Sequence, residues 1–320
     1  MMLSPRRGGA RRHVAVLAMM GALALVPRTG EAYCRTTTSP IPASYSPSSG
    51  CFTKGLFLYW KGACIGYSIQ QAASQNVSFE DATRIIDAAF ATWNNVECPG
   101  SGGAVGTATS NLGPVSCAEV RYNPTGPNQN LIVFRDDRWP YSDPNNTLGL
   151  TTVTFNADTG EIYDADMEIN ASGRNLSISD VVPPNGFDLL SVITHEAGHF
   201  LGLAHATSAS STMFASYRPG SSALRSLSGD DIAGICEIYP DTAIRSVSTQ
   251  VAATGRLAAT ACDPTPRHGF GSTCDANPAP SDSNDKGCAV TAGASSSPAA
   301  TLGAAGLAVA LLLRRRRGAV

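Results

Sequence analysis

The feature that most constrains this chain is the stretch from His195 to His205, which holds three of its five histidines. If the stretch is helical, His195 and His199 lie about one turn apart and project from the same face. Gly202 can adopt the left-handed conformation that ends a helix and turns the chain back, which brings His205 towards the other two. The pattern therefore predicts a metal site with three imidazole ligands.

Zinc is the metal that this ligand set favours. Three neutral nitrogens leave a fourth tetrahedral position for water, as in catalytic rather than structural sites. Glu196 is offset by about 100 degrees around the helix, so we expect it to take a proton from that water instead of binding the ion. A bare His-Glu-x-x-His could be a surface helix, but Gly202 and His205 complete a far more specific pattern.

With these residues the stretch resembles the metzincin superfamily of zinc endopeptidases, and within it the matrixins. Met213 is similar to the methionine of the Met-turn that lies beneath the zinc, although a core methionine would look the same. Tyr217 matches the tyrosine that lines the pocket for the residue after the scissile bond, and residues 227–235 resemble the start of the C-terminal helix. The resemblance implies an α+β catalytic domain over residues 51–243, with a twisted mixed five-stranded sheet, an active-site helix and a C-terminal helix.

Local patterns predict the elements of this domain. Ser78 and Asp81 form an N-terminal capping pattern, and apolar residues then recur at helical spacing as far as Trp93. Residues 101–113 are rich in Gly, Ser and Thr and are expected to form a loop. Strands are expected at residues 56–60, 64–69, 119–122, 131–134, 148–155 and 161–170.

The resemblance places residues 148–155 as the edge strand above the cleft, beside a strand at 164–170. An edge strand has free N–H and C=O groups, so an extended peptide can pair with it as an added strand. We therefore expect protein or peptide substrates in extended conformation.

An acidic cluster follows this edge strand. It could bind calcium, which prefers hard oxygen ligands, but no EF-hand-like spacing supports the metal, and solvent-exposed charge is the favoured interpretation. No histidine lies between His13 and His195, so we predict no second, structural zinc of the kind some matrixins hold. The cluster consists of Asp158, Asp164, Asp166 and Glu168.

Nine cysteines indicate disulfides formed outside the cytosol. We expect a Cys34–Cys51 disulfide; the alternative is that Cys34 caps the zinc. Cys98 and Cys117 are expected to pin the loop between them. Setting Cys288 aside leaves enough cysteines for four disulfides.

The two ends of the chain predict export. Residues 1–32 have an Arg-rich start, an apolar run too short to cross a membrane and a small-residue cleavage site, which favours a signal peptide over an anchor. A short segment, residues 33–50, is expected to precede the catalytic domain. Residues 244–287 are predicted to form a low-complexity linker. Residues 288–320, which end in an Arg cluster, resemble bacterial C-terminal sorting signals of the MYXO-CTERM type; a plain tail anchor is the alternative.

Charge and site together define the expected function. The formal net charge is -2, but Arg is concentrated near both ends, so the body between them is acidic and nucleic acid is excluded as a partner. We expect a monomeric, secreted or surface-tethered zinc metalloendopeptidase that hydrolyses extracellular proteins. The alternatives are a non-catalytic adhesin with a structural zinc site and a hydrolase of non-peptide substrates; Glu196 and the open fourth position argue against the adhesin.

Overall fold

Residues 33–100, 102–248, 251–257, 259–274, 286–288 and 291–292 are described by the structure, a computed structural model. The predicted signal peptide and residues 293–320 of the predicted sorting segment lie outside these ranges. Within the described ranges, no helix combines the length and the apolar character that crossing a membrane requires.

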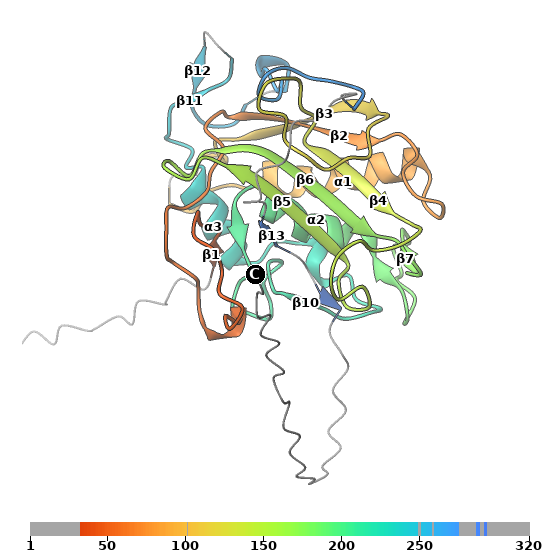
Figure 1. Cartoon of the computed structure of the whole chain (residues 1–320). Coiled ribbons are helices and arrows are strands. Elements are labelled where there is room, and N and C mark those ends of the chain that lie inside the picture. Colours follow the sequence, from red (N-terminus) through yellow and green to blue (C-terminus); the bar gives the residue numbers. More distant parts are fainter. Residues whose placement is uncertain are drawn as a thin grey trace, which may run out of the picture. The chain divides into compact units, whose positions relative to one another are not determined.

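A mixed sheet forms the centre of the fold (Figure 1). β2 pairs in parallel with β3 and β4, β4 pairs in parallel with β6, and β5 runs antiparallel to β6. These strands confirm the predicted mixed five-stranded sheet, and a strand from the C-terminal region, β13, is added outside β5. In spatial order the strands are β13 (Lys286–Cys288), β5 (Gly149–Phe155), β6 (Ile162–Asn170), β4 (Leu131–Arg135), β2 (Cys64–Gln70) and β3 (Ala108–Val115).

Short strands pair outside this sheet. β1 with β9 and β11 with β12 are antiparallel, whereas β7 with β8 and β10 with β14 are parallel. Their bounds, with those of the 3-10 helices, are β1 (Cys34–Arg35), η1 (Pro47–Ser49), β7 (Leu176–Ser177), β8 (Phe187–Asp188), β9 (Leu203–Ala204), β10 (Ser216–Tyr217), η2 (Ala223–Arg225), β11 (Arg245–Ser246), β12 (Ala252–Ala253), η3 (Ala259–Ala261) and β14 (Thr291–Ala292).

Helix α1 (Phe79–Asn94) begins as the sequence predicts, because the Ser78 side chain accepts a hydrogen bond from the Asp81 backbone N–H. Its apolar stripe is buried, and the Trp93 indole N–H donates to the Thr194 carbonyl at 2.9 Å. This bond ties α1 to α2 (Leu189–Phe200). The predicted C-terminal helix is α3 (Gly229–Ile238), which opens with a capping box at Ser228.

Two strand predictions and the loop prediction are wrong. Residues 101–113 include the first part of β3, whose Ser, Thr and Asn side chains are half-exposed while its backbone pairs with β2. A strand held by backbone bonds at the outer position of a sheet needs no apolar alternation, so the pattern gave no signal. Residues 119–122 are irregular, and residues 56–60 form only isolated bridges.

Four disulfides join the described cysteines. Cys34–Cys51 is confirmed, which rules out a free Cys34 thiolate as a cap for zinc. Cys98 and Cys117 do not close the loop between them, because connectivity depends on contacts distant in sequence. Cys64–Cys262 and Cys117–Cys274 attach part of the segment predicted as a linker to the catalytic domain. The third long-range disulfide is Cys98–Cys236, which joins the chain after α1 to α3.

Candidate metal centre

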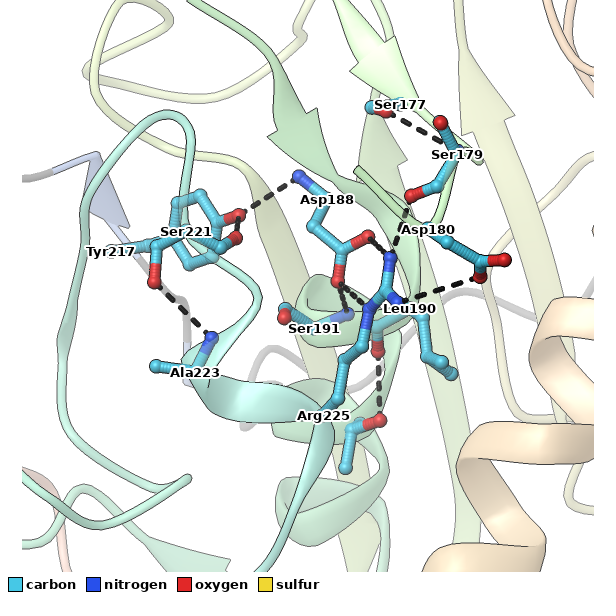
Figure 2. Close-up of polar contacts among 11 residues, drawn as sticks. Ser177, Ser179, Asp180, Asp188, Leu190, Ser191, Tyr217, Ser221, Ala223 and Arg225 are labelled. Atoms are coloured by element: carbon cyan, nitrogen blue, oxygen red, sulfur yellow. Dashed lines mark hydrogen bonds and ion pairs between the residues drawn. The ribbon is translucent and has the colours of Figure 1, made fainter. Parts of the chain in front are cut away.

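The start of α2 is fixed by a buried carboxylate. Asp188 accepts a hydrogen bond from the Ser191 backbone N–H at 2.9 Å and so caps the helix. The Arg225 guanidinium donates to both carboxylate oxygens of Asp188, at 2.8 and 2.6 Å (Figure 2). This two-point contact leaves α2 little freedom at the end that precedes its histidines.

The structure brings the three predicted imidazoles together. The ligand atoms of His195, His199 and His205 all lie within 4.8 Å of one another. α2 ends at Phe200, and Gly202 then takes a φ of 99°, where a Cβ would lie 2.9 Å from the Leu58 carbonyl oxygen. Only glycine fits this turn without strain, and the turn carries His205 back towards the helix.

Backbone carbonyls orient two of the rings. Nδ1 of His195 lies 2.6 Å from the Thr212 carbonyl oxygen, and Nδ1 of His199 lies 2.9 Å from that of Leu203. A carbonyl oxygen only accepts, so each Nδ1 carries the proton and each Nε2 presents a lone pair. The two Nε2 atoms are 3.1 Å apart.

Burial keeps these imidazoles neutral. Desolvation, with a further contribution from the nearby His205, lowers the pKa of His195 to about 3 and places the pKa of His199 well below its usual value. Metal binding requires neutral imidazole, so the ligands are ready at neutral pH. Three imidazole nitrogens form a donor set that fits Zn²⁺ with one position left for solvent or substrate.

Glu196 is fully buried beside the histidines. Its Oε2 accepts a hydrogen bond from the Thr151 hydroxyl on β5 at 2.7 Å. A Cβ at Gly149, on the same strand, would lie only 2.7 Å from Oε1 of Glu196. Neither Thr151 nor Gly149 could be predicted as part of the site, because nothing local in the sequence shows which β5 residues reach the helix.

Met213 is buried against α2. A Cβ at Gly198 would lie 2.2 Å from its sulfur, so the glycine is what allows helix and methionine to meet. The loop that carries Met213 is held by Asp231 of α3, whose carboxylate accepts from the backbone N–H groups of Thr212 and Met213 at 2.8 and 3.1 Å. The resemblance of residues 227–235 to the start of a C-terminal helix gave no indication of this contact.

Tyr217, on β10, is buried. Its hydroxyl accepts from the Asp188 backbone N–H at 2.9 Å and donates to the Ser221 carbonyl (Figure 2). Desolvation raises the pKa of Tyr217 to about 12, so the phenol stays protonated. A cavity of about 390 Å³ opens here, lined by Ala209, Phe214, Ser216, Tyr217, Arg218, Ser221, Ala223 and Leu224.

A comparison with protein families matches residues 59–240, more than half of the chain, to the model described as Matrixin. The chain belongs to the matrixin family. The match spans the strands β2 to β6 and the helices α1, α2 and α3.

Individual matrixin relatives match over shorter stretches. Rat matrilysin is 35% identical over 103 residues, 32% of this chain and 35% of the relative. Human matrix metalloproteinase-26 is 33% identical over 104 residues, 32% of this chain and 36% of the relative. Metalloendoproteinase 1-MMP of Arabidopsis thaliana is 27% identical over 181 residues, 56% of this chain and 44% of the relative. The chain thus spans about a third to under a half of these relatives.

The acidic cluster of this matrixin differs from the prediction of solvent-exposed charge. Asp164, Asp166 and Glu168 are at most 4% exposed, and only Asp158 lies in an exposed turn. Glu168 is bound by Arg135 and by the Tyr141 hydroxyl. The prediction failed because the chain around these two partners folds over the polar face of β6, which strand alternation alone cannot show.

These carboxylates do not form a ligand set for calcium. Asp166 accepts from the Leu131 backbone N–H at 2.6 Å, and burial beside Asp164 raises its pKa well above the usual value. A raised pKa makes a carboxyl group a poorer ligand for a hard cation. Among the described residues, the one grouping of three or more potential metal ligands is the histidine triad.

Proposed function

We propose that this chain is a zinc-dependent metalloendopeptidase that hydrolyses peptide bonds of extracellular proteins. One observation carries the proposal: two buried imidazoles and the half-buried imidazole of His205 converge within 4.8 Å, and the carboxylate of Glu196 is held beside them by the Thr151 hydroxyl. Membership of the matrixin family supports it. A purely structural zinc site would be expected to have four protein ligands.

Each residue has a distinct part in the proposed reaction. Zinc, when bound, supplies polarisation of the substrate carbonyl and a water of lowered pKa. The three histidines hold the ion, and Glu196 takes the proton of the attacking water and delivers it to the leaving amine. The hydrogen bond from Thr151 restricts the Glu196 carboxylate to one orientation, which reduces the entropy lost on reaching the transition state.

The walls of the site favour an extended substrate. On its side away from β6, β5 accepts an antiparallel strand, as its pairing with β13 demonstrates, and an extended peptide could pair there in the same way. The cavity beside Tyr217 can hold one substrate side chain, and apolar Phe214 and Leu224 in its lining favour an apolar residue. We propose that backbone pairing sets the register and that this cavity selects the residue.

Our proposals about where the protein is located rest on its sequence. An Arg-rich apolar leader at residues 1–32 supports export, and the apolar segment before the Arg cluster at 314–317 supports sorting to the cell surface. Four disulfides support an oxidising compartment. We propose that the protein acts as a monomer there.

The Glu196→Gln variant tests the reaction. We expect wild-type protein loaded with zinc to cut a fluorogenic peptide library, and the variant to lose at least about a thousandfold in kcat while it binds one zinc per chain as before. Zinc content, measured by atomic absorption, controls for loss of the site. Equal behaviour of the two proteins would favour the adhesin instead.

A further inference from the structure

The C-terminal region contacts both walls of the candidate substrate groove. β13 (Lys286–Cys288) pairs antiparallel with β5, and β14 (Thr291–Ala292) pairs in parallel with β10 (Figure 1). We propose that these two strands, here called the tail segment, occupy the substrate groove and exclude extended peptides until they are displaced. The inference concerns regulation of the site described under the proposed function and rests on that function.

The tail segment uses the pairing side of β5 that a substrate would need. β5 pairs with β6 on one side, and β13 takes the other. A second peptide cannot bond to backbone groups of Thr151–Val153 while residues 286–288 are paired with them. Binding of tail and binding of substrate are therefore mutually exclusive along this strand.

The paired residues flank the metal-binding groups. Cys288 is in register with Thr151, whose hydroxyl donates to the Glu196 carboxylate at 2.7 Å. On the opposite wall, Ala292 is in register with Tyr217, which lines the cavity of about 390 Å³. The two strands therefore pair at the wall beside Glu196 and at the wall beside the cavity, the two places that we propose an extended substrate uses.

A disulfide keeps the tail segment close to the groove. Cys274 is bonded to Cys117, which follows β3. Residues 275–285 can span about 36 Å at about 3.3 Å each when extended, more than the roughly 24 Å between the outermost strands of a six-stranded sheet. A tether of this length gives an effective concentration on the order of a millimolar, so even weak pairing can compete with substrate.

The contact is nevertheless short enough to be reversible. It consists of three residue pairs on β5 and two on β10, and each backbone hydrogen bond contributes about 0.5–1.5 kcal/mol net. An external peptide that pairs over a longer stretch and fills the cavity can displace the tail segment. We therefore expect the tail to raise KM and to leave kcat unchanged.

Proline substitutions in the full, zinc-loaded chain test this inference. The double variant Gly287→Pro, Thr291→Pro removes one backbone N–H from each paired strand, and Ser281→Pro, Ser283→Pro is the matched control. If the tail occupies the groove nine-tenths of the time, KM for a fluorogenic peptide falls about tenfold in the first variant and stays unchanged in the control. A synthetic peptide of residues 284–294 should then inhibit that variant competitively.

Hydrogen exchange provides a readout that needs no activity. In the Glu196→Gln background, we expect the amides of Thr151–Val153 to exchange more slowly with the native tail than with Gly287→Pro, Thr291→Pro. If this difference appears, but neither the zinc-loaded wild-type chain nor the proline variant cuts peptides, the proposed function is wrong while the tail segment still occupies the groove. Unchanged KM together with unchanged exchange overturns the inference. Intact-mass detection of cleavage between Cys288 and Thr291 also overturns it, because the tail would then be a substrate.

Discussion

The buried carboxylate of Glu196 is positioned by one hydroxyl group of the neighbouring strand. Thr151 donates to its Oε2 at 2.7 Å, and Gly149 leaves the room that the carboxylate fills. In the proposed reaction this carboxylate accepts a proton and releases it again, and it gains from being held in one orientation. We therefore propose Thr151 as a positioning residue, which acts through Glu196.

Thr151→Val should lower kcat by roughly tenfold to a hundredfold, because a hydrogen bond to a charged group contributes about 1.5–3 kcal/mol. KM should change little, since the backbone of β5 is retained. Thr151→Ser restores the hydroxyl and should recover most of the rate. Steady-state kinetics over a pH series measures both, and the acidic limb of kcat should shift only in the Val variant. Thr152→Val, the next residue on the strand, is the control and should keep the native profile.

At the scale of the element, α2 depends on the ion pair at its first turn. Asp188 is fully buried, caps the helix and is bonded at two points by Arg225. The carboxylate raises the pKa of Arg225 through their hydrogen bond. Loss of one partner would leave a buried charge without compensation, which is the costly case for an ion pair.

Arg225→Ala should destabilise the protein by about 3 kcal/mol, because Asp188 then remains buried and unneutralised. Denaturant unfolding of the zinc-free protein with its disulfides intact measures the change. The exposed pair of Arg84 and Asp81 on α1 provides the comparison, and Arg84→Ala should leave the midpoint nearly unchanged. An equal effect of both substitutions would show that the buried pair has no special role.

At the scale of the whole molecule, long-range links assemble the site. The disulfides Cys64–Cys262, Cys98–Cys236 and Cys117–Cys274 span sequence separations of 198, 138 and 157 residues. They hold together segments that would otherwise separate early in unfolding. Zinc held by the three histidines, as proposed, would join α2 to the chain that follows it, so its removal should destabilise the whole domain.

Zinc removal should therefore lower stability as well as activity. Free zinc at about 100 times its Kd adds about 2.7 kcal/mol to the free energy of unfolding, if only the folded chain binds it. Differential scanning calorimetry with a chelator and after zinc is restored should show a reversible change in Tm. His199→Ala should show a much smaller change, and a full response to zinc in that variant would contradict the proposed ligand set.

The local parts of the fold and site could be predicted from the sequence. The helix Phe79–Asn94 and its cap at Ser78 follow from spacing within a few residues, as does the approach of His195 to His199. Sequence could not predict the partners of Glu196 and Met213, since Thr151 and Asp231 are distant in sequence. The prediction that Glu168 is exposed to solvent failed for the same reason, because the residues that bind its carboxylate, Arg135 and Tyr141, are distant in sequence.

By itself, the sequence determined which three imidazoles converge, because helical periodicity and one glycine turn fix their relative directions. It also determined that the cysteines would be paired, but of the disulfides it indicated only Cys34–Cys51. Tertiary structure alone decided the other pairings, the hydroxyl beside Glu196 and the placement of residues 286–288 on β5. These features depend on which distant segments the folded sheet and its disulfides bring into contact, and no local sequence pattern indicates those contacts.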